Sequence, residues 1–174
     1  MDNTTQTAVK LNGAQQAFKK KMMNALAFNT FTLTQVPLGY LAGMRMKKLE
    51  ADSCETTMPF TWLNKNPFKS IYFAAQSMAA ELSTAAICML AVQGYSPSVA
   101  FIIVDLQATF PKKATGKVTF TCVDGDKIFE AVRKAIETGE AATVKAKTVG
   151  KMKDGTIVSE FYFTWSFKQR SKKK

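Results

Sequence analysis

Residues 70–90 read SIYFAAQSMAAELSTAAICML, and this stretch selects the fold. It is rich in Ala and apolar nearly all round, which predicts a helix buried on every side. Small side chains also let neighbouring backbone approach it closely. Five polar residues interrupt the run, and one of them, Glu81, is a central carboxylate. A membrane span does not readily tolerate such a group, so we expect a core helix and no membrane span.

Stretches with strand-like patterns lie on both sides of this helix. Two precede it and four follow, and a second helix over residues 126–138, stopped by Gly139, separates the fourth strand from the fifth. Lys153-Asp-Gly155 is typical of a hairpin turn between the last two. The predicted strands cover residues 44–50, 53–61, 99–110, 117–123, 143–151 and 156–168.

The last strand places an apolar, largely aromatic set on one face, which predicts either core or a dimer interface. The set is Ile157, Phe161, Phe163, Trp165 and Phe167. One all-round apolar helix with about six antiparallel strands favours an α+β fold in which a curved sheet wraps around the helix. This is the hotdog architecture, although the same periodicity fits other α+β sandwiches.

The chain length of 174 residues predicts a single domain. We expect a flexible N-terminus over residues 1–11, a hotdog domain over 12–167 and a basic tail over 168–174. The domain begins with a helix over residues 12–29, capped by Asn12 with Gln15 in the capping-box position. Its apolar stripe is Phe18, Met22 and Leu26.

Composition excludes several classes of site. The chain has no histidine, which removes histidine-dependent triads and mixed His/Cys zinc sites. Its three cysteines are too few for an all-cysteine zinc site and are odd in number for a secreted disulfide framework. No secretory signal is recognisable in MDNTTQTAVK, so we expect a cytoplasmic protein. We also expect no metal, because nothing in the sequence clusters His, Cys and carboxylates with ligand spacing.

The net charge of +11 is typical of a nucleic-acid-binding protein, but much of the positive charge lies at the C-terminus. Five of the last seven residues are Lys or Arg. A polyanion binder normally adds interleaved aromatic residues or a recognisable reading helix, and neither is evident. We therefore expect no specific nucleic-acid partner, and keep a basic nucleic-acid-binding module as the third-ranked hypothesis.

Glu81 is the candidate catalytic residue. It is the only acidic residue between Glu55 and Asp105, with Ser77 and Thr84 on its helical face. A buried carboxylate must be paired, solvated or raised in pKa, and a raised pKa in a cleft suits a general base. The alternative is a Glu whose tip reaches solvent or a partner across a subunit boundary. The unpaired backbone N–H groups at the helix start, Tyr72 to Ala74, can hold an oxyanion.

The segment Asn66-Pro-Phe-Lys-Ser-Ile-Tyr-Phe-Ala74, followed by Glu81, resembles the phenylacetate-pathway (PaaI-like) hotdog thioesterases. Those enzymes carry Asn-x-x-Gly-x-x-His-Gly-Gly and an acidic residue nine positions after the His. Here Tyr72 replaces the His, and Phe73 and Ala74 replace the two Gly. The likeness spans residues 37–167 and is greatest to an uncharacterised branch with an Asn-Pro-x-x-Ser-Ile-Tyr-Phe motif.

The resemblance implies hydrolysis of an acyl-CoA thioester in a homodimer or tetramer, with each site at a subunit boundary and no cofactor beyond the coenzyme A of the substrate. Glu81 and Asn66 are the implied catalytic residues: Glu81 activates water or attacks the thioester, and Asn66 orients the water or the carbonyl. The implied substrate-binding residues are Tyr72, Phe73, Ala74, Ser77, Lys112 and Lys113, and the lysines meet the phosphates of coenzyme A.

Three departures from the family pattern leave a second hypothesis open. Side chains at Phe73 and Ala74 stand where the family brings bare backbone to the thioester, and Ile103 stands where some relatives place a hydroxyl. The alternative is a non-catalytic hotdog protein that binds acyl groups or acyl thioesters. Asn66 before Pro67 also has an ordinary explanation as turn chemistry.

Overall fold

The computed structural model describes residues 9–171. Parts of two predicted segments, residues 1–8 of the N-terminus and 172–174 of the basic tail, therefore lie outside the described residues. The six predicted strands form one antiparallel sheet in the order β1-β2-β4-β5-β6-β3. Their bounds are β1 Arg45–Leu49, β2 Cys54–Met58, β3 Val99–Thr109, β4 Val118–Cys122, β5 Ala142–Met152 and β6 Ile157–Gln169.

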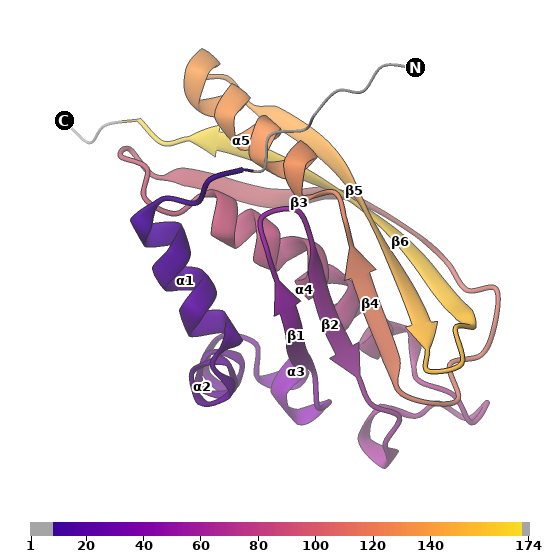
Figure 1. Cartoon of the computed structure of the whole chain (residues 1–174). Helices are drawn as coiled ribbons and strands as arrows, with labels where there is room; N and C mark the ends of the chain where they lie inside the picture. The colour runs from indigo at the N-terminus through magenta and orange to yellow at the C-terminus, as the bar shows by residue number, and fades with distance from the viewer. Residues whose placement is uncertain (1–8, 172–174) are drawn as a thin grey trace, which may run out of the picture.

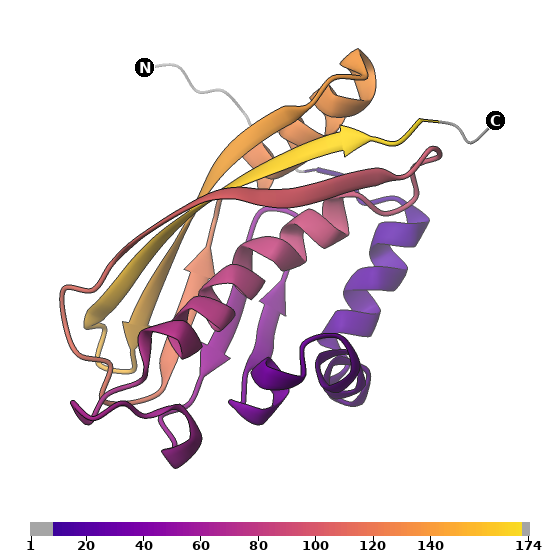
Figure 2. The ribbon, with the colours of Figure 1, turned by 180° about the vertical axis from the view of Figure 1, so that it is seen from behind.

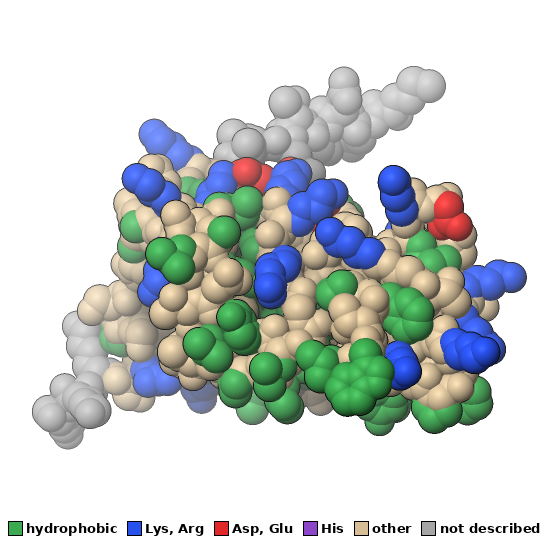
Figure 3. Space-filling model, turned by 90° about the horizontal axis from the view of Figure 1, so that it is seen from below, with side chains coloured by type: hydrophobic (Ala, Val, Ile, Leu, Met, Phe, Trp, Pro, Cys, Tyr) green, Lys and Arg blue, Asp and Glu red, His purple; other side chains and the backbone are tan. Residues whose placement is uncertain are grey.

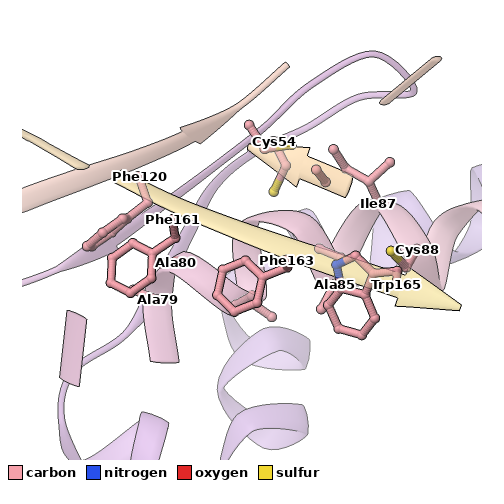
Figure 4. Packing of buried hydrophobic residues seen from close by; sticks show 14 of the residues in the cluster. Cys54, Ala79, Ala80, Ala85, Ile87, Cys88, Phe120, Phe161, Phe163 and Trp165 are labelled. Carbon is pink, nitrogen blue, oxygen red and sulfur yellow. The ribbon is translucent and has the colours of Figure 1, made fainter. Parts of the chain in front are cut away.

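The sheet curves around the long helix α4 (Phe73–Ala91), as Figures 1 and 2 show from opposite sides. Its alanines are the reason for the close fit: Ala79, Ala80 and Ala86 are fully buried. Against them pack the aromatic side chains of β6, including Phe161, Phe163 and Trp165 (Figure 4). The aromatic residues of the last strand are therefore core within one chain, which settles the alternative between core and dimer interface for them. Ile157, predicted on the same face, is 38% exposed, because the pairing of β5 with β6 is irregular beside it.

The polar residues that interrupt the apolar run fasten α4 to the sheet. Ser83 Oγ donates to Thr148 Oγ1 at 2.8 Å, and Thr84 Oγ1 accepts from Trp165 Nε1 at 3.0 Å. Near the helix start, Gln76 Oε1 accepts from Ser159 Oγ at 3.0 Å. Buried hydroxyl and amide groups are tolerated when they are paired in this way. They set the rotation of the helix against the sheet.

The N-terminal helix prediction is partly wrong. Asn12 does cap a helix, and both capping-box bonds with Gln15 are present. The predicted span 12–29, however, is divided into α1 (Gly13–Met23) and α2 (Ala25–Gln35). Asn24 takes an extended ψ of 120° and its side chain caps α2, which ends the first helix. Leu26 consequently leaves the predicted stripe and is 77% exposed.

Two further α-helices, α3 and α5, lie in the described chain, together with the short 3-10 helix η1 (Trp62–Asn64). The short α3 (Pro37–Leu41) is absent from the predicted elements. Proline and glycine usually interrupt a helix, yet Pro37 occupies the first turn, where its missing N–H is harmless. The predicted second helix is α5 (Gly125–Thr138), and Gly139 ends it with a φ of +69°. Within residues 9–171, α4 is the one helix long and apolar enough to cross a membrane, and 67% of its most apolar window is buried, as befits a core helix.

Candidate functional site

The loop before α4 is organised by Asn66. Its Oδ1 accepts from Phe68 N at 3.0 Å, from Ser70 N at 3.2 Å and from Ser70 Oγ at 3.2 Å. These bonds close a tight turn in which Lys69 adopts a φ of +57°. Asn66 thus shapes the loop, as its turn-chemistry interpretation predicts. Its amide Nδ2 still makes no hydrogen bond within the described residues and remains a donor.

The start of α4 is held firmly and left uncapped. Ile71 N donates to Ala114 O at 2.8 Å, and Tyr72 N donates to Asn64 O at 2.7 Å. Tyr72 is the N-cap residue and makes no side-chain cap bond. In the described part of the chain, the N–H groups of Phe73, Ala74 and Ala75 have no acceptor. Three donors therefore point out of the positive end of the helix dipole.

A pocket of about 500 Å³ lies at this helix start. Its wall is aromatic: the rings of Tyr72 and Phe73 lie 4.8 Å apart, and those of Phe73 and Phe110 lie 6.3 Å apart. Lys112 and Lys113, which follow β3, add two cations to the lining, and Asn66 adds an amide. An apolar cavity with cationic groups in its lining suits an acyl group joined to an anionic carrier.

Glu81 lies further along α4 and is half-buried. Burial raises the pKa of its carboxyl above the usual value. Neither hydroxyl on its helical face binds the carboxylate, because Ser77 Oγ donates to Phe73 O and Thr84 Oγ1 donates to Glu81 O. Within residues 9–171 the carboxylate has no ion pair and no hydrogen bond. The Glu81 carboxyl group is thus unpaired and only partly solvated.

The structure brings together five of the eight predicted site residues. Asn66, Tyr72, Phe73, Lys112 and Lys113 line one pocket. The other three, Glu81, Ala74 and Ser77, do not line it. Eight residues of helix rise separate Glu81 from Phe73, which is about 12 Å along the axis.

Sequence analysis did not single out the other residues that line the pocket, among them Gln76 and Phe110. Gln76 is buried, and its Nε2 donates to Ile71 O at 3.2 Å, so it supports the loop as well as the cavity. The available signal was its interruption of the apolar run, the same signal that singled out Glu81. Phe110 gave no local signal, because its contact with Phe73 joins residues far apart in the chain.

The cysteines are core residues. All three are buried and free. Burial raises the pKa of the Cys122 thiol to about 12 and that of Cys88 well above its usual value. Thiols held protonated in this way are poor nucleophiles.

Comparisons with known proteins found one matching family model and several solved structures of similar fold. A family model for a domain of unknown function, DUF4442, matches residues 24–167. No curated protein matches the sequence. Among solved structures, a Pseudomonas aeruginosa protein named as of unknown function and a probable thioesterase is similar with 21% identity and a TM-score of 0.71, over 82% of this chain and 93% of that one.

Two further solved structures have the same fold. A protein of unknown function from Chlorobaculum tepidum is 12% identical with a TM-score of 0.71, over 90% of this chain and 97% of that one. A thioesterase from Haemophilus influenzae is 14% identical with a TM-score of 0.60, over 90% of this chain and 99% of that one. The predicted hotdog fold is confirmed.

Proposed function

The chain belongs to the DUF4442 family, and from this and the geometry of its site we propose that it is an acyl-CoA thioesterase with Glu81 as general base or nucleophile. The observation that carries the proposal is an aromatic pocket beside three unpaired helix-start N–H groups, on the same helix as a half-buried carboxylate of raised pKa. Solved hotdog proteins named as thioesterases support the reaction class.

The distance between Glu81 and the pocket favours a site shared by two subunits. An attacking oxygen and an oxyanion donor must both lie about 3 Å from the reacting group. Glu81 lies about 12 Å along the axis from Phe73 of its own chain. A site therefore pairs the helix start of one subunit with Glu81 of the partner subunit.

The edge strand β3 supplies a surface for this association. It pairs with β6 on one side only, since it ends the sheet. Ile102, Val104 and Leu106 are exposed along it. Unprotected apolar edges recruit a further strand. We therefore assign the homodimer contact to β3. A tetramer would need other surfaces in addition. We also propose that the protein is cytoplasmic.

The proposed chemistry needs no cofactor. Glu81 takes a proton from water, and the resulting hydroxide attacks the thioester carbonyl carbon. The N–H groups of Phe73 and Ala74 hold the oxyanion that forms. When the carbon–sulfur bond breaks, the thiolate of coenzyme A takes the proton from Glu81, which leaves a free carboxylic acid and the thiol. Asn66 Nδ2 orients the carbonyl or the water, and Lys112 and Lys113 meet the phosphates.

The second candidate, a non-catalytic acyl-binding protein, rests on Phe73. Its ring packs edge-on against Phe110, so the helix start meets the pocket through a bulky side chain. A binder would use this aromatic wall for the acyl group and would have no use for the Glu81 carboxylate.

Turnover of an acyl-CoA panel by wild type, Glu81→Gln and Glu130→Gln separates the two. The panel runs from short to long chains and includes phenylacetyl- and benzoyl-CoA. Glu130 is an exposed acid on α5 and serves as the matched control. Loss of about a hundredfold or more in Glu81→Gln alone is expected for a lost acid–base group.

The other outcomes are equally informative. Unchanged turnover in Glu81→Gln removes that residue from the mechanism. Acyl-CoA binding without turnover by the wild type, measured by calorimetry, establishes the non-catalytic protein instead.

A further inference from the structure

The helices α2 and α3 form a surface without charge. Residues 22–44 contain no charged side chain, although 21% of the chain is charged. Much of this segment is nevertheless on the outside, with Leu26 exposed by 77%, Leu38 by 71% and Leu41 by 59%. A helix facing water normally carries charged residues on its outer face. This surface is therefore built for contact with something less polar than water.

A second exposed apolar group adjoins it. The short helix η1 (Trp62–Asn64) is tied to the end of α3, because Asn64 Nδ2 donates to Ala42 O at 3.1 Å. Trp62 is 77% exposed, and Phe60, Leu63 and Phe68, which lie near it in the chain, are exposed as well. We call the combined surface the lower apolar face: Leu26, Leu33, Val36, Leu38, Leu41, Phe60, Trp62, Leu63 and Phe68. Figure 3 shows apolar side chains spread across this side of the molecule.

The hydroxyl groups of α2 are already satisfied inside the helix. Thr30 Oγ1 donates to Leu26 O at 3.0 Å, Thr32 Oγ1 to Phe28 O at 2.9 Å and Thr34 Oγ1 to Thr30 O at 2.9 Å. Polar groups that are bonded to their own backbone lose little when water is removed. These three hydroxyl groups can therefore enter a poorly hydrated layer without losing a hydrogen bond.

The charges around the face have one sign. No acidic residue occurs between Asp2 and Glu50, or between Glu55 and Glu81. Lys21 lines the same surface hollow as Leu26, and Lys65 and Lys69 line one with Phe60. Arg45 lies over the Tyr40 ring, 5.9 Å from its centroid. Cations around exposed Leu, Phe and Trp match the anionic headgroups and acyl boundary of a bilayer.

We propose that the lower apolar face docks the protein on the surface of an anionic lipid bilayer, a function beyond the proposed thioesterase activity. The apolar side chains enter the acyl boundary and the basic groups meet the lipid phosphates. Phe68 belongs both to this face and to the lining of the acyl pocket. Docking thus brings the mouth of the pocket close to the membrane, where molecules with long acyl chains accumulate.

Vesicle co-sedimentation tests the proposal on the full chain. The probes are vesicles of phosphatidylcholine alone and of equal parts phosphatidylcholine and phosphatidylglycerol. Wild type should sediment with the mixed vesicles and lose binding as salt rises. Leu38→Ser/Leu41→Ser and Trp62→Ser/Leu63→Ser should each weaken binding by about tenfold or more. Val123→Ser is the matched control, because Val123 is 72% exposed but lies outside the face.

Circular dichroism and sedimentation velocity of each variant establish that it is folded and report its mass. Three results overturn the proposal: no binding of wild type to mixed vesicles, equal binding to both vesicle types, or equal loss in Val123→Ser. A fall in oligomeric mass in the face variants without vesicle binding by wild type assigns the face to contact between protein chains. Vesicle binding does not depend on Glu81, so Glu81→Gln should sediment like wild type whatever its turnover.

Discussion

Glu81, the proposed catalytic base, also affects the stability of the fold. Its burial raises the pKa of the carboxyl, so the folded protein favours the protonated form more than the unfolded chain does. Its stabilising contribution is present below the unfolded pKa and is lost as the pH rises through the folded pKa. Above its folded pKa the carboxylate is thus held ionised at a cost to stability, a common feature of functional groups.

This sign leads to a thermal prediction. Glu81→Gln should have a higher melting temperature than wild type at pH 7, and the difference should shrink as the pH falls through the raised folded pKa of Glu81 towards the unfolded value of about 4.3. Differential scanning calorimetry between pH 4 and pH 7 measures it, with Glu130→Gln as the exposed control. A constant difference across this range would show that the Glu81 carboxyl is solvated.

The same shift predicts the pH dependence of turnover. A base must be ionised, so kcat/KM should fall on the acid side with an apparent pKa above the value of about 4.3 for an exposed glutamate. Rates of acyl-CoA hydrolysis from pH 4 to pH 8 measure this limb. A limb at the ordinary glutamate value would point to a different base.

Among the elements, α5 shows how a single glycine permits close packing. Gly125 begins the helix against the turn between β1 and β2, and its N–H donates to Asp52 O at 3.0 Å. A Cβ at this position would lie 2.0 Å from Ala51 O. The obstacle is backbone, which cannot rotate away as a side chain can.

Gly125→Ala should therefore destabilise the protein by about 3 kcal/mol or more, at the upper end of overpacking effects. Gly13→Ala is the control, because Gly13 also begins a helix and has nothing within 4 Å of the added carbon. Urea unfolding gives both free energies. Similar midpoints for the two variants would mean that the β1–β2 turn yields without strain.

For the whole molecule, the exposed edge of β3 and the separation of Glu81 from the pocket lead to one prediction. Val104→Lys places a charge on the edge that we assign to the dimer, and edge lysines block strand pairing. Sedimentation velocity should show the mass of a single chain, and turnover should fall by about a hundredfold, since each pocket loses the partner's base. Val123→Lys, a charge on another exposed valine, should change neither. A monomeric Val104→Lys with full activity would place the complete site in one chain.

Mixing inactive subunits sharpens this test. Heterodimers of Glu81→Gln with a chain carrying Phe73→Pro, which removes the Phe73 N–H proposed as an oxyanion donor, contain one intact site if the subunits share it. Such mixtures should recover activity that neither parent has. Without recovery, the site lies within one subunit.

The six strands, the buried helix and the α+β class were predictable from residue patterns, because periodicity and turn chemistry act between neighbours in the chain. The choice of the hotdog fold among α+β sandwiches depended on the family resemblance as well. The break at Asn24 was not, since capping of α2 overrides a stripe that continues through it. Only part of the pocket could be predicted from one stretch of sequence, the segment that holds Asn66 and Tyr72. The residues after β3 reach this segment through the hydrogen bond between Ile71 and Ala114, and they are Phe110, Lys112 and Lys113. The lower apolar face likewise combines segments that meet through the bond from Asn64 to Ala42. Local patterns specify elements, whereas pockets and surfaces arise from long-range packing, which no single stretch encodes.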